Sequence, residues 1–161
     1  MELVRDIMQP DVICVPENMT VRELCSVLAH NRIAGAPVVD AQDYLVGVVS
    51  LADVARFVAG LPASEASVLP LLEPCGQDYW NSGPSHRPEI RTDDIAETTR
   101  VKDIMNQRVY RVNNQASIKE VVDLMISEGI HRVIVTHRDH VIGIVTSLDL
   151  MRVFSRRLEE E

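Results

Sequence analysis

Two short motifs place a hydroxyl and a carboxylate at the same spacing in each half of the chain. They are Ser50-Leu51-Ala52-Asp53 and Thr146-Ser147-Leu148-Asp149. A carboxylate can accept hydrogen bonds from both hydroxyls of a ribose, and a hydroxyl side chain can donate to phosphate or sugar oxygens. The alternative is a capping box, in which the acidic residue only stabilises a helix N-terminus. The two interpretations are compatible, because a helix start with spare amides also attracts anions.

A third motif adds positive charge to the second half alone. Ile130-His131-Arg132 precedes an apolar run, whereas the matching string in the first half is Ile33-Ala34-Gly35. The guanidinium of Arg132 fits a phosphate bidentately, and His131 adds a donor whose charge depends on pH. The alternative is a solvated pair of side chains just before a strand.

These motifs belong to a unit that the chain contains twice. Val4-Arg5-Asp6-Ile7-Met8 returns as Val101-Lys102-Asp103-Ile104-Met105. A repeat of about 50 residues that occurs only twice is too short for a solenoid or a propeller. Two such units facing one another predict a globule with pseudo-two-fold symmetry and with clefts where the units meet.

Each unit has the pattern strand, helix, strand, strand, helix. Thr20 with Glu23 and Ser117 with Glu120 form capping boxes that begin the first helix of each unit. Alternating or continuous apolar runs predict the strands. The predicted strands are 12–15, 37–39 and 45–49 in the first unit and 109–112, 133–135 and 141–145 in the second, and the closing helices are 51–59 and 147–158.

Composition excludes several classes of function. The net charge of −8 disfavours binding to nucleic acid or to an anionic membrane surface. No apolar run reaches the roughly 18 residues of a membrane span. The three cysteines form no CxxC pair, which fits a reduced, cytoplasmic protein. No nucleophile stands beside a plausible base in a known motif, so we expect no enzymatic activity.

A different kind of sequence separates the two units. We expect repeat one at 1–60, an insert at 61–100 and repeat two at 101–161. The insert holds five of the eight prolines and the only tryptophan, Trp80. A connection of this length is usually functional or disordered. Trp80 either packs on its own domain or docks a protein partner.

The order of elements and six motifs, in the same order in both halves of the chain though not letter for letter, resemble the CBS (cystathionine β-synthase) domain. They include the leading D-I-M, A-P-V-V-D and the G-h-h-[S/T]-x-x-D string, and the match covers about residues 3–58 and 100–155. The resemblance implies an α+β fold of two βαββα repeats, a tandem pair called a Bateman module. It further implies a regulatory, non-catalytic homodimer that binds adenosine-containing ligands between its repeats. AMP, ADP or ATP is the expected ligand, S-adenosylmethionine is possible, and no cofactor is expected.

The resemblance also implies two unequal sites, each combining the acidic motif of one repeat with the leading segment of the other. Site one is expected to contain Ser50, Asp53, Met105, Tyr110, Ile130, His131 and Arg132. Site two is expected to contain Thr146, Asp149, Met8, Ile13, Ile33, Ala34 and Gly35. The Ile-His-Arg string resembles one in the γ subunit of AMP-activated protein kinase, where such residues reach nucleotide phosphates.

Several alternatives remain open on the sequence alone. Tyr110 is either a half-buried strand aromatic or a platform on which a base stacks. His137 and His140 look superficially like a metal pair, but a solvated turn explains them more simply. The alternative to a ligand-binding module is a dimerisation scaffold with empty clefts, in which the Trp80 segment docks a partner.

Overall fold

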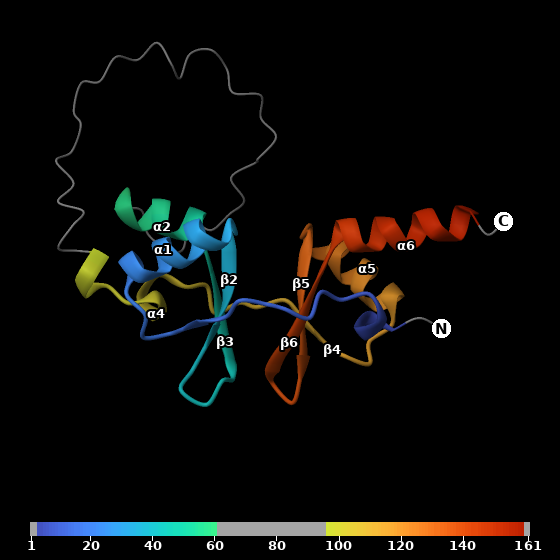
Figure 1. The fold of residues 1–161 in the computed structure, drawn as a ribbon, viewed down its shortest axis with the longest axis horizontal. Helices are drawn as coiled ribbons and strands as arrows, with labels where there is room; N and C mark the ends of the chain where they lie inside the picture. Colours follow the sequence, from blue (N-terminus) through green and yellow to red (C-terminus); the bar gives the residue numbers. More distant parts are fainter. Residues whose placement is uncertain (1–2, 61–95, 160–161) are drawn as a thin grey trace, which may run out of the picture.

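The computed structural model describes residues 3–60 and 96–159. It confirms the α+β fold of two repeats (Figure 1). The first repeat consists of β1 (Val15–Pro16), α1 (Val21–Asn31), β2 (Gly35–Val39), β3 (Leu45–Ser50) and α2 (Leu51–Val58). The second consists of β4 (Arg111–Asn113), α5 (Ile118–Glu128), β5 (Arg132–His137), β6 (His140–Thr146) and α6 (Ser147–Glu159). A short helical turn leads into each repeat: η1 (Val4–Asp6) and α4 (Val101–Ile104).

The two sheets have the same topology. Each has three strands, of which the first two run parallel and the last two antiparallel. The last strand of each repeat leads directly into its closing helix. As a result, α2 and α6 begin on the same edge of the molecule and run away from the junction in opposite directions (Figure 1). We call the junction between the two repeats the seam.

The predicted helix caps are present. The hydroxyl of Thr20 accepts from the amide of Glu23 at 3.2 Å, and Ser117 accepts from Glu120 at 3.2 Å. Behind these caps the apolar stripe of each helix faces its own sheet, because the i, i+3, i+4, i+7 positions share one side of a helix. The buried members are Val21, Leu24 and Leu28 in α1 and Val121 and Met125 in α5.

The first strand of each repeat is shorter and later than the sequence predicted. The predictions were 12–15 and 109–112, whereas β1 and β4 begin at Val15 and Arg111. The chain ahead of each strand leaves its own sheet and crosses the seam. Gln9 and Asn106, on these crossing segments, form bridges to strands of the opposite repeat.

The leading segments are exchanged between the repeats. Val4, fully buried, packs in the core of repeat two with Val121, Val133 and Val145. Val101, also fully buried, packs in the core of repeat one. The amide of Val4 donates to the carbonyl of Ala116 at 2.8 Å, which fixes the segment on the second repeat. Each core is thus completed by residues that belong, in sequence, to the other unit.

Paired main-chain hydrogen bonds hold both crossings. Gln9 and Ile144 of β6 exchange two bonds, of 2.9 and 3.0 Å. Asn106 and Val48 of β3 exchange two bonds, of 2.9 and 2.8 Å. The last strand of each sheet is therefore extended by one antiparallel bridge to a residue of the opposite repeat.

Two glycines allow this close approach. A Cβ on Gly47 would lie 2.6 Å from the sulfur of Met105, and one on Gly143 would lie 2.5 Å from the sulfur of Met8. These distances are shorter than van der Waals contact, so a side chain at either position would push the crossing segment away. The glycine of each G-h-h-[S/T]-x-x-D string therefore serves the packing of the seam.

Candidate functional site

The two acidic motifs form the starts of α2 and α6, at the edge of the seam. Asp53 Oδ2 accepts from the amide of Ser50 at 2.7 Å and from its hydroxyl at 2.6 Å. Asp149 Oδ2 accepts from the amide of Thr146 at 2.9 Å and from its hydroxyl at 2.6 Å. The Asp53 and Asp149 side chains are only 10% and 5% exposed. Both motifs are capping boxes, and each leaves a carboxylate fixed at the end of a strand.

An arginine one helical turn later pairs with each carboxylate. Arg56 forms an ion pair with Asp53 Oδ1, and Arg152 Nη1 lies 2.9 Å from Asp149 Oδ1. The sequence interpretation missed both arginines, although the spacing Asp-x-x-Arg occurs in both repeats. Side chains three residues apart on a helix are neighbours, so this spacing was the signal.

The structure reveals a further partner of Asp149. Burial alone would raise the pKa of Asp149, but hydrogen bonds from Thr146 and Gln9 and the charge of Arg152 outweigh burial and lower the pKa. Gln9 comes from the crossing segment of the other repeat, and its Nε2 lies 3.0 Å from Asp149 Oδ1. The sequence interpretation did not include Gln9, and no local pattern singles it out.

The strings 33–35 and 130–132 lie beside the helix starts of their own repeats. The carbonyl of Ala34 accepts from the amide of Leu51 at 2.9 Å, and that of His131 accepts from Ser147 at 3.0 Å. In the strand register, Gly35 lies opposite Ser50 and Arg132 lies opposite Thr146. The string that was assigned to site one thus adjoins, through its main chain, the acidic motif that was assigned to site two.

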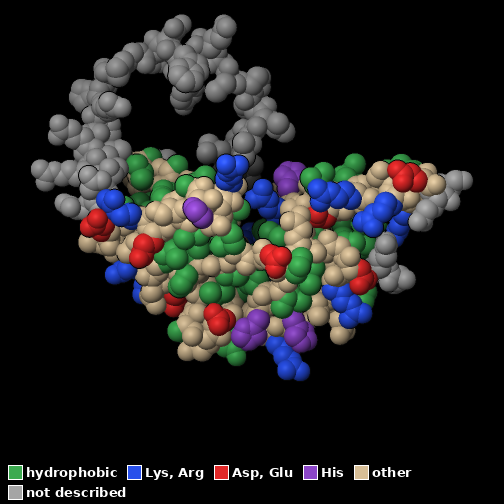
Figure 2. All heavy atoms as spheres, viewed as in Figure 1, with side chains coloured by type: hydrophobic (Ala, Val, Ile, Leu, Met, Phe, Trp, Pro, Cys, Tyr) green, Lys and Arg blue, Asp and Glu red, His purple; other side chains and the backbone are tan. Residues whose placement is uncertain are grey.

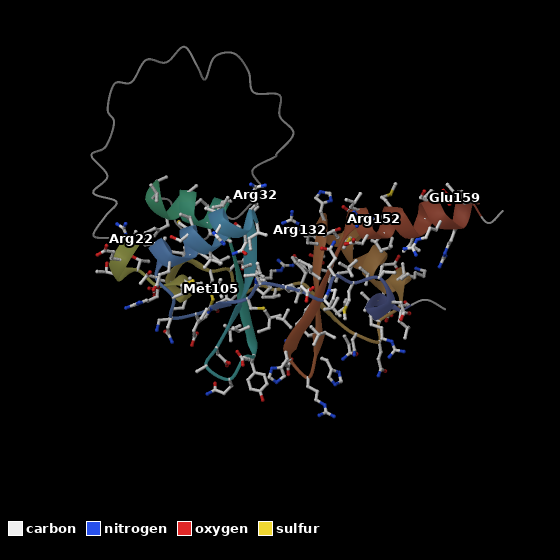
Figure 3. The ribbon with its side chains drawn as sticks, viewed as in Figure 1. Arg22, Arg32, Met105, Arg132, Arg152 and Glu159 are labelled. Atoms are coloured by element: carbon white, nitrogen blue, oxygen red, sulfur yellow. The ribbon has the colours of Figure 1, made fainter. Side chains whose placement is uncertain are left out.

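Two arginines flank the seam on this edge. Figure 3 shows Arg132, the first residue of β5, and Arg32, which ends α1, on either side of the junction. Both are exposed, and neither guanidinium has an ion-pair or hydrogen-bond partner within residues 3–60 and 96–159. Figure 2 shows the surface notched between the repeats here, with basic side chains and a histidine beside the notch. The sequence interpretation included Arg132 but not Arg32.

The predicted apolar site residues differ in their burial. Met8 and Met105 lie against the glycines of β6 and β3, so the structure brings each to the strand that carries its predicted acidic partner. Ile33 and Ile130 pack against the cores of their own repeats. Ile13 is 36% exposed on the crossing segment.

Tyr110 makes its polar contacts within its own repeat. Its hydroxyl donates to Glu128 at 2.7 Å, and this hydrogen bond is the main reason that the pKa of Tyr110 is raised. The guanidinium of Arg108 lies 5.3 Å from the centre of the tyrosine ring and 3.2 Å from Glu128. Tyr110 is half-buried.

The histidines of the β5–β6 turn lie at the opposite edge of the seam. The His140 ring lies 4.8 Å from that of Tyr44, and its Nδ1 is 3.1 Å from the carbonyl of Asp43. His140 therefore joins the turns of the two repeats.

Across the described residues, no group of three or more His, Cys, Asp or Glu has the arrangement of a metal site. No helix in this part of the chain is long and apolar enough to span a membrane. Trp80 lies outside the described residues.

Two βαββα repeats that exchange their leading segments, with an acidic helix start from each at a common seam, define a pseudo-symmetric two-repeat module. The family model of the CBS domain matches residues 4–60 and 101–156. This chain belongs to the CBS domain family.

Curated relatives from Methanocaldococcus jannaschii extend over most of the chain. The uncharacterized protein MJ1426 is 27% identical over 92% of the chain and 89% of its own length. The uncharacterized protein MJ1232 is 27% identical over 98% of the chain, which spans 41% of that longer protein.

Two solved structures have the same fold. The CBS domain pair of protein MJ0100, in complex with 5-methylthioadenosine and S-adenosyl-L-methionine, is 23% identical, with 98% of both chains covered and a TM-score of 0.65. CBSX2 in complex with AMP is 20% identical, with 97% of this chain and 98% of that chain covered and a TM-score of 0.66.

Proposed function

We propose that this chain is a regulatory module that binds adenosine-containing ligands at the seam and responds by a change in conformation or in partner affinity. The observation that carries the proposal is the carboxylate of Asp53, which Ser50 holds at the end of β3, on the edge of the molecule where Arg32 and Arg132 stand on either side of the seam (Figure 3). Ligands of this class in the CBS pairs MJ0100 and CBSX2 support it. We assign no catalytic step to the chain and propose a cytoplasmic location.

The chemistry of the seam favours a nucleotide with at least one phosphate, such as AMP, ADP or ATP. Asp53 provides the acceptor for a ribose diol. Arg132 and His131, together with Arg32, provide donors for phosphate oxygens, and Arg–phosphate pairs are among the stronger hydrogen bonds. S-adenosylmethionine has the same ribose but a positive sulfonium in place of phosphate, so we rank it below the nucleotides.

Thermal unfolding with AMP, ADP, ATP, S-adenosylmethionine and adenosine tests the proposal. A ligand that binds only the folded state stabilises it by about 2.7 kcal/mol at 100 times its Kd. For a chain of this size, that corresponds to a rise in Tm of roughly 5–10 °C. The absence of a shift with all five ligands at millimolar concentration would argue against the function.

A matched pair of variants separates binding from helix capping. Asp53→Ala removes the acid of the box that begins α2, and Glu23→Ala removes the acid of the equivalent box that begins α1. Each should cost up to about 1 kcal/mol of stability. Only Asp53→Ala should also weaken AMP binding. Equal AMP affinity in the two variants would show that Asp53 acts as a cap alone.

A second function, dimerisation, is favoured by an apolar surface on α6. Leu148, Met151, Phe154 and Leu158 are each more than half exposed. A second copy of the chain, packed helix against helix, would bury them, so we also propose a homodimer. Light scattering should give twice the chain mass of 18.0 kDa, and Phe154→Glu should shift the protein to monomer. A wild-type monomer at micromolar concentration would contradict the dimer.

A further inference from the structure

The Asp149 carboxylate accepts from donors at the end of β6, in α6 and on the crossing segment of repeat one. Thr146 binds Oδ2 through its amide and hydroxyl, and Arg152 binds Oδ1 at 2.9 Å. The Gln9 side chain spans both oxygens, with Nε2 at 3.0 Å from Oδ1 and 3.2 Å from Oδ2. A carboxylate offers about four lone-pair positions. Within the described residues, the acceptor capacity of Asp149 is therefore filled.

Asp53, the equivalent residue in repeat one, has no such partner among the described residues. It accepts from Ser50 and pairs with Arg56. The position equivalent to Gln9 is Asn106, whose main chain makes the same paired hydrogen bonds to the opposite sheet. Its side chain is one methylene shorter, and its Oδ1 accepts from the amide of Arg108 at 2.8 Å. The crossing is thus conserved between the repeats, but the contact to the acid is not.

The presence or absence of the glutamine contact decides how many acceptor positions each carboxylate has left for a ribose. Two ribose hydroxyls need two free acceptor positions on one carboxylate. Asp53 can offer them after a small adjustment of Arg56, whereas at Asp149 the Gln9 amide stands where the diol would donate. Hydrogen bonds to a charged group are worth more than neutral ones, so displacing the Gln9 amide reduces the affinity of an incoming ligand.

We propose that Gln9 determines ligand selectivity between the two sites, by closing the Asp149 carboxylate to a ribose. Adenosine ligands then fill the Asp53 site first. Occupation of the Asp149 site requires the Gln9 side chain to turn away, and the site should bind roughly ten- to hundredfold more weakly. This inference rests on the proposed function, because it assumes that a ribose approaches these carboxylates.

The side chain of Gln9 can be changed without removing its structural role. The bonds between Gln9 and Ile144 are made by the main chain, so substitutions at position 9 leave them in place. Gln9→Asn gives repeat one the residue that repeat two already has at the equivalent crossing. Gln9→Ala removes the amide altogether. Asn106→Gln is the reciprocal change and should place an amide within reach of Asp53.

Calorimetric titration with adenosine tests the inference, because adenosine presents the ribose without phosphate. Wild type should show a tighter and a weaker class of sites, and Asp53→Ala should remove the tighter class. Both Gln9→Asn and Gln9→Ala should tighten the weaker class at least tenfold. Asn106→Gln should weaken the tighter class and leave the weaker one unchanged.

Different outcomes overturn the inference and the function. If wild type binds adenosine equally well at both sites, or if neither Gln9 variant tightens the weaker site, the role of Gln9 is overturned but the proposed function is not. No binding of adenosine or AMP to any folded variant would overturn both. Thermal unfolding of each variant, with Tm within a few degrees of wild type, serves as the folding control.

Discussion

Arg32 and Gly129 occupy equivalent places at the ends of α1 and α5, and both have left-handed backbone, with φ of 54° and 62°. Glycine adopts this conformation without steric cost, whereas a residue with a Cβ loses about 1 kcal/mol. Repeat one therefore accepts a local strain that repeat two avoids. The residue at this position carries an exposed guanidinium beside the seam, on the same edge as Arg132 (Figure 3).

Arg32→Gly should raise stability and lower nucleotide affinity together. The glycine relieves the left-handed strain, so we expect a gain of up to about 1 kcal/mol in the free energy of unfolding. Arg138→Gly is the matched control, because Arg138 is also exposed, with φ of 51°, but lies in the β5–β6 turn. Denaturant unfolding should show a similar gain for both, and AMP binding should weaken in Arg32→Gly alone. Unchanged AMP affinity in Arg32→Gly would show that Arg32 contacts no phosphate.

Arg132→Ala should discriminate between AMP and adenosine. A charge-assisted contact to phosphate is worth about 1.5–3 kcal/mol, so AMP affinity should fall roughly ten- to hundredfold. Adenosine affinity should change much less, and the loss for AMP should shrink as ionic strength rises. Calorimetry of both ligands in parallel makes the measurement, with Arg138→Ala as the control for net charge. Equal losses for AMP and adenosine would mean that Arg132 supports the structure of the site and not the phosphate.

Val4→Ala should disturb the repeat to which Val4 does not belong in sequence. The side chain is fully buried in the core of repeat two, and removal of its methyl groups should cost about 1–3 kcal/mol. The largest changes in backbone amide chemical shift should fall in α5, β5 and β6. Val101→Ala should produce the reverse pattern, with changes in α1, β2 and β3. Changes confined to the repeat that carries the substitution would contradict the exchange of leading segments.

Asp149 should make stability depend on pH in the acid range. Its pKa is lowered in the folded state, so its contribution is fully present above the unfolded value of about 4 and is lost as the pH falls through the folded value. Asp149→Asn cannot titrate at this position. The difference in unfolding free energy between wild type and Asp149→Asn should therefore be largest at neutral pH and shrink below about pH 4. A constant difference down to pH 2 would contradict this assignment.

The parts of the fold that short patterns specify could be predicted from the sequence. Each capping box joins residues three positions apart, as Thr20 and Glu23 do, and the polar groups that satisfy the helix start are visible in the string itself. Ser50 with Asp53 and Thr146 with Asp149 were found for the same reason. Arg56 and Arg152 could have been found with them, since they share the same helix face.

Contacts between distant segments could not be predicted in this way. Gln9 and Asp149 are 140 residues apart, and nothing near either one indicates the other. The exchange of leading segments was equally hidden. Val4 and Val101 stand in matching strings, so packing on either repeat satisfies the same apolar pattern. The conformation of Arg32 was missed because a left-handed helix end is normally indicated by glycine.

The exchange of leading segments makes the two halves of the chain complementary fragments. A chain cut between residues 60 and 96 would give two fragments. The first would contain Val4 but lack the core of repeat two, which Val4 completes, and the second would contain Val101 but lack the core of repeat one. Neither piece can form a closed core alone, so the two should reconstitute only when mixed. In the intact chain the same dependence predicts a single heat-absorption peak, with equal calorimetric and van't Hoff enthalpies. The two repeats, although separate in sequence, should therefore unfold as one cooperative unit.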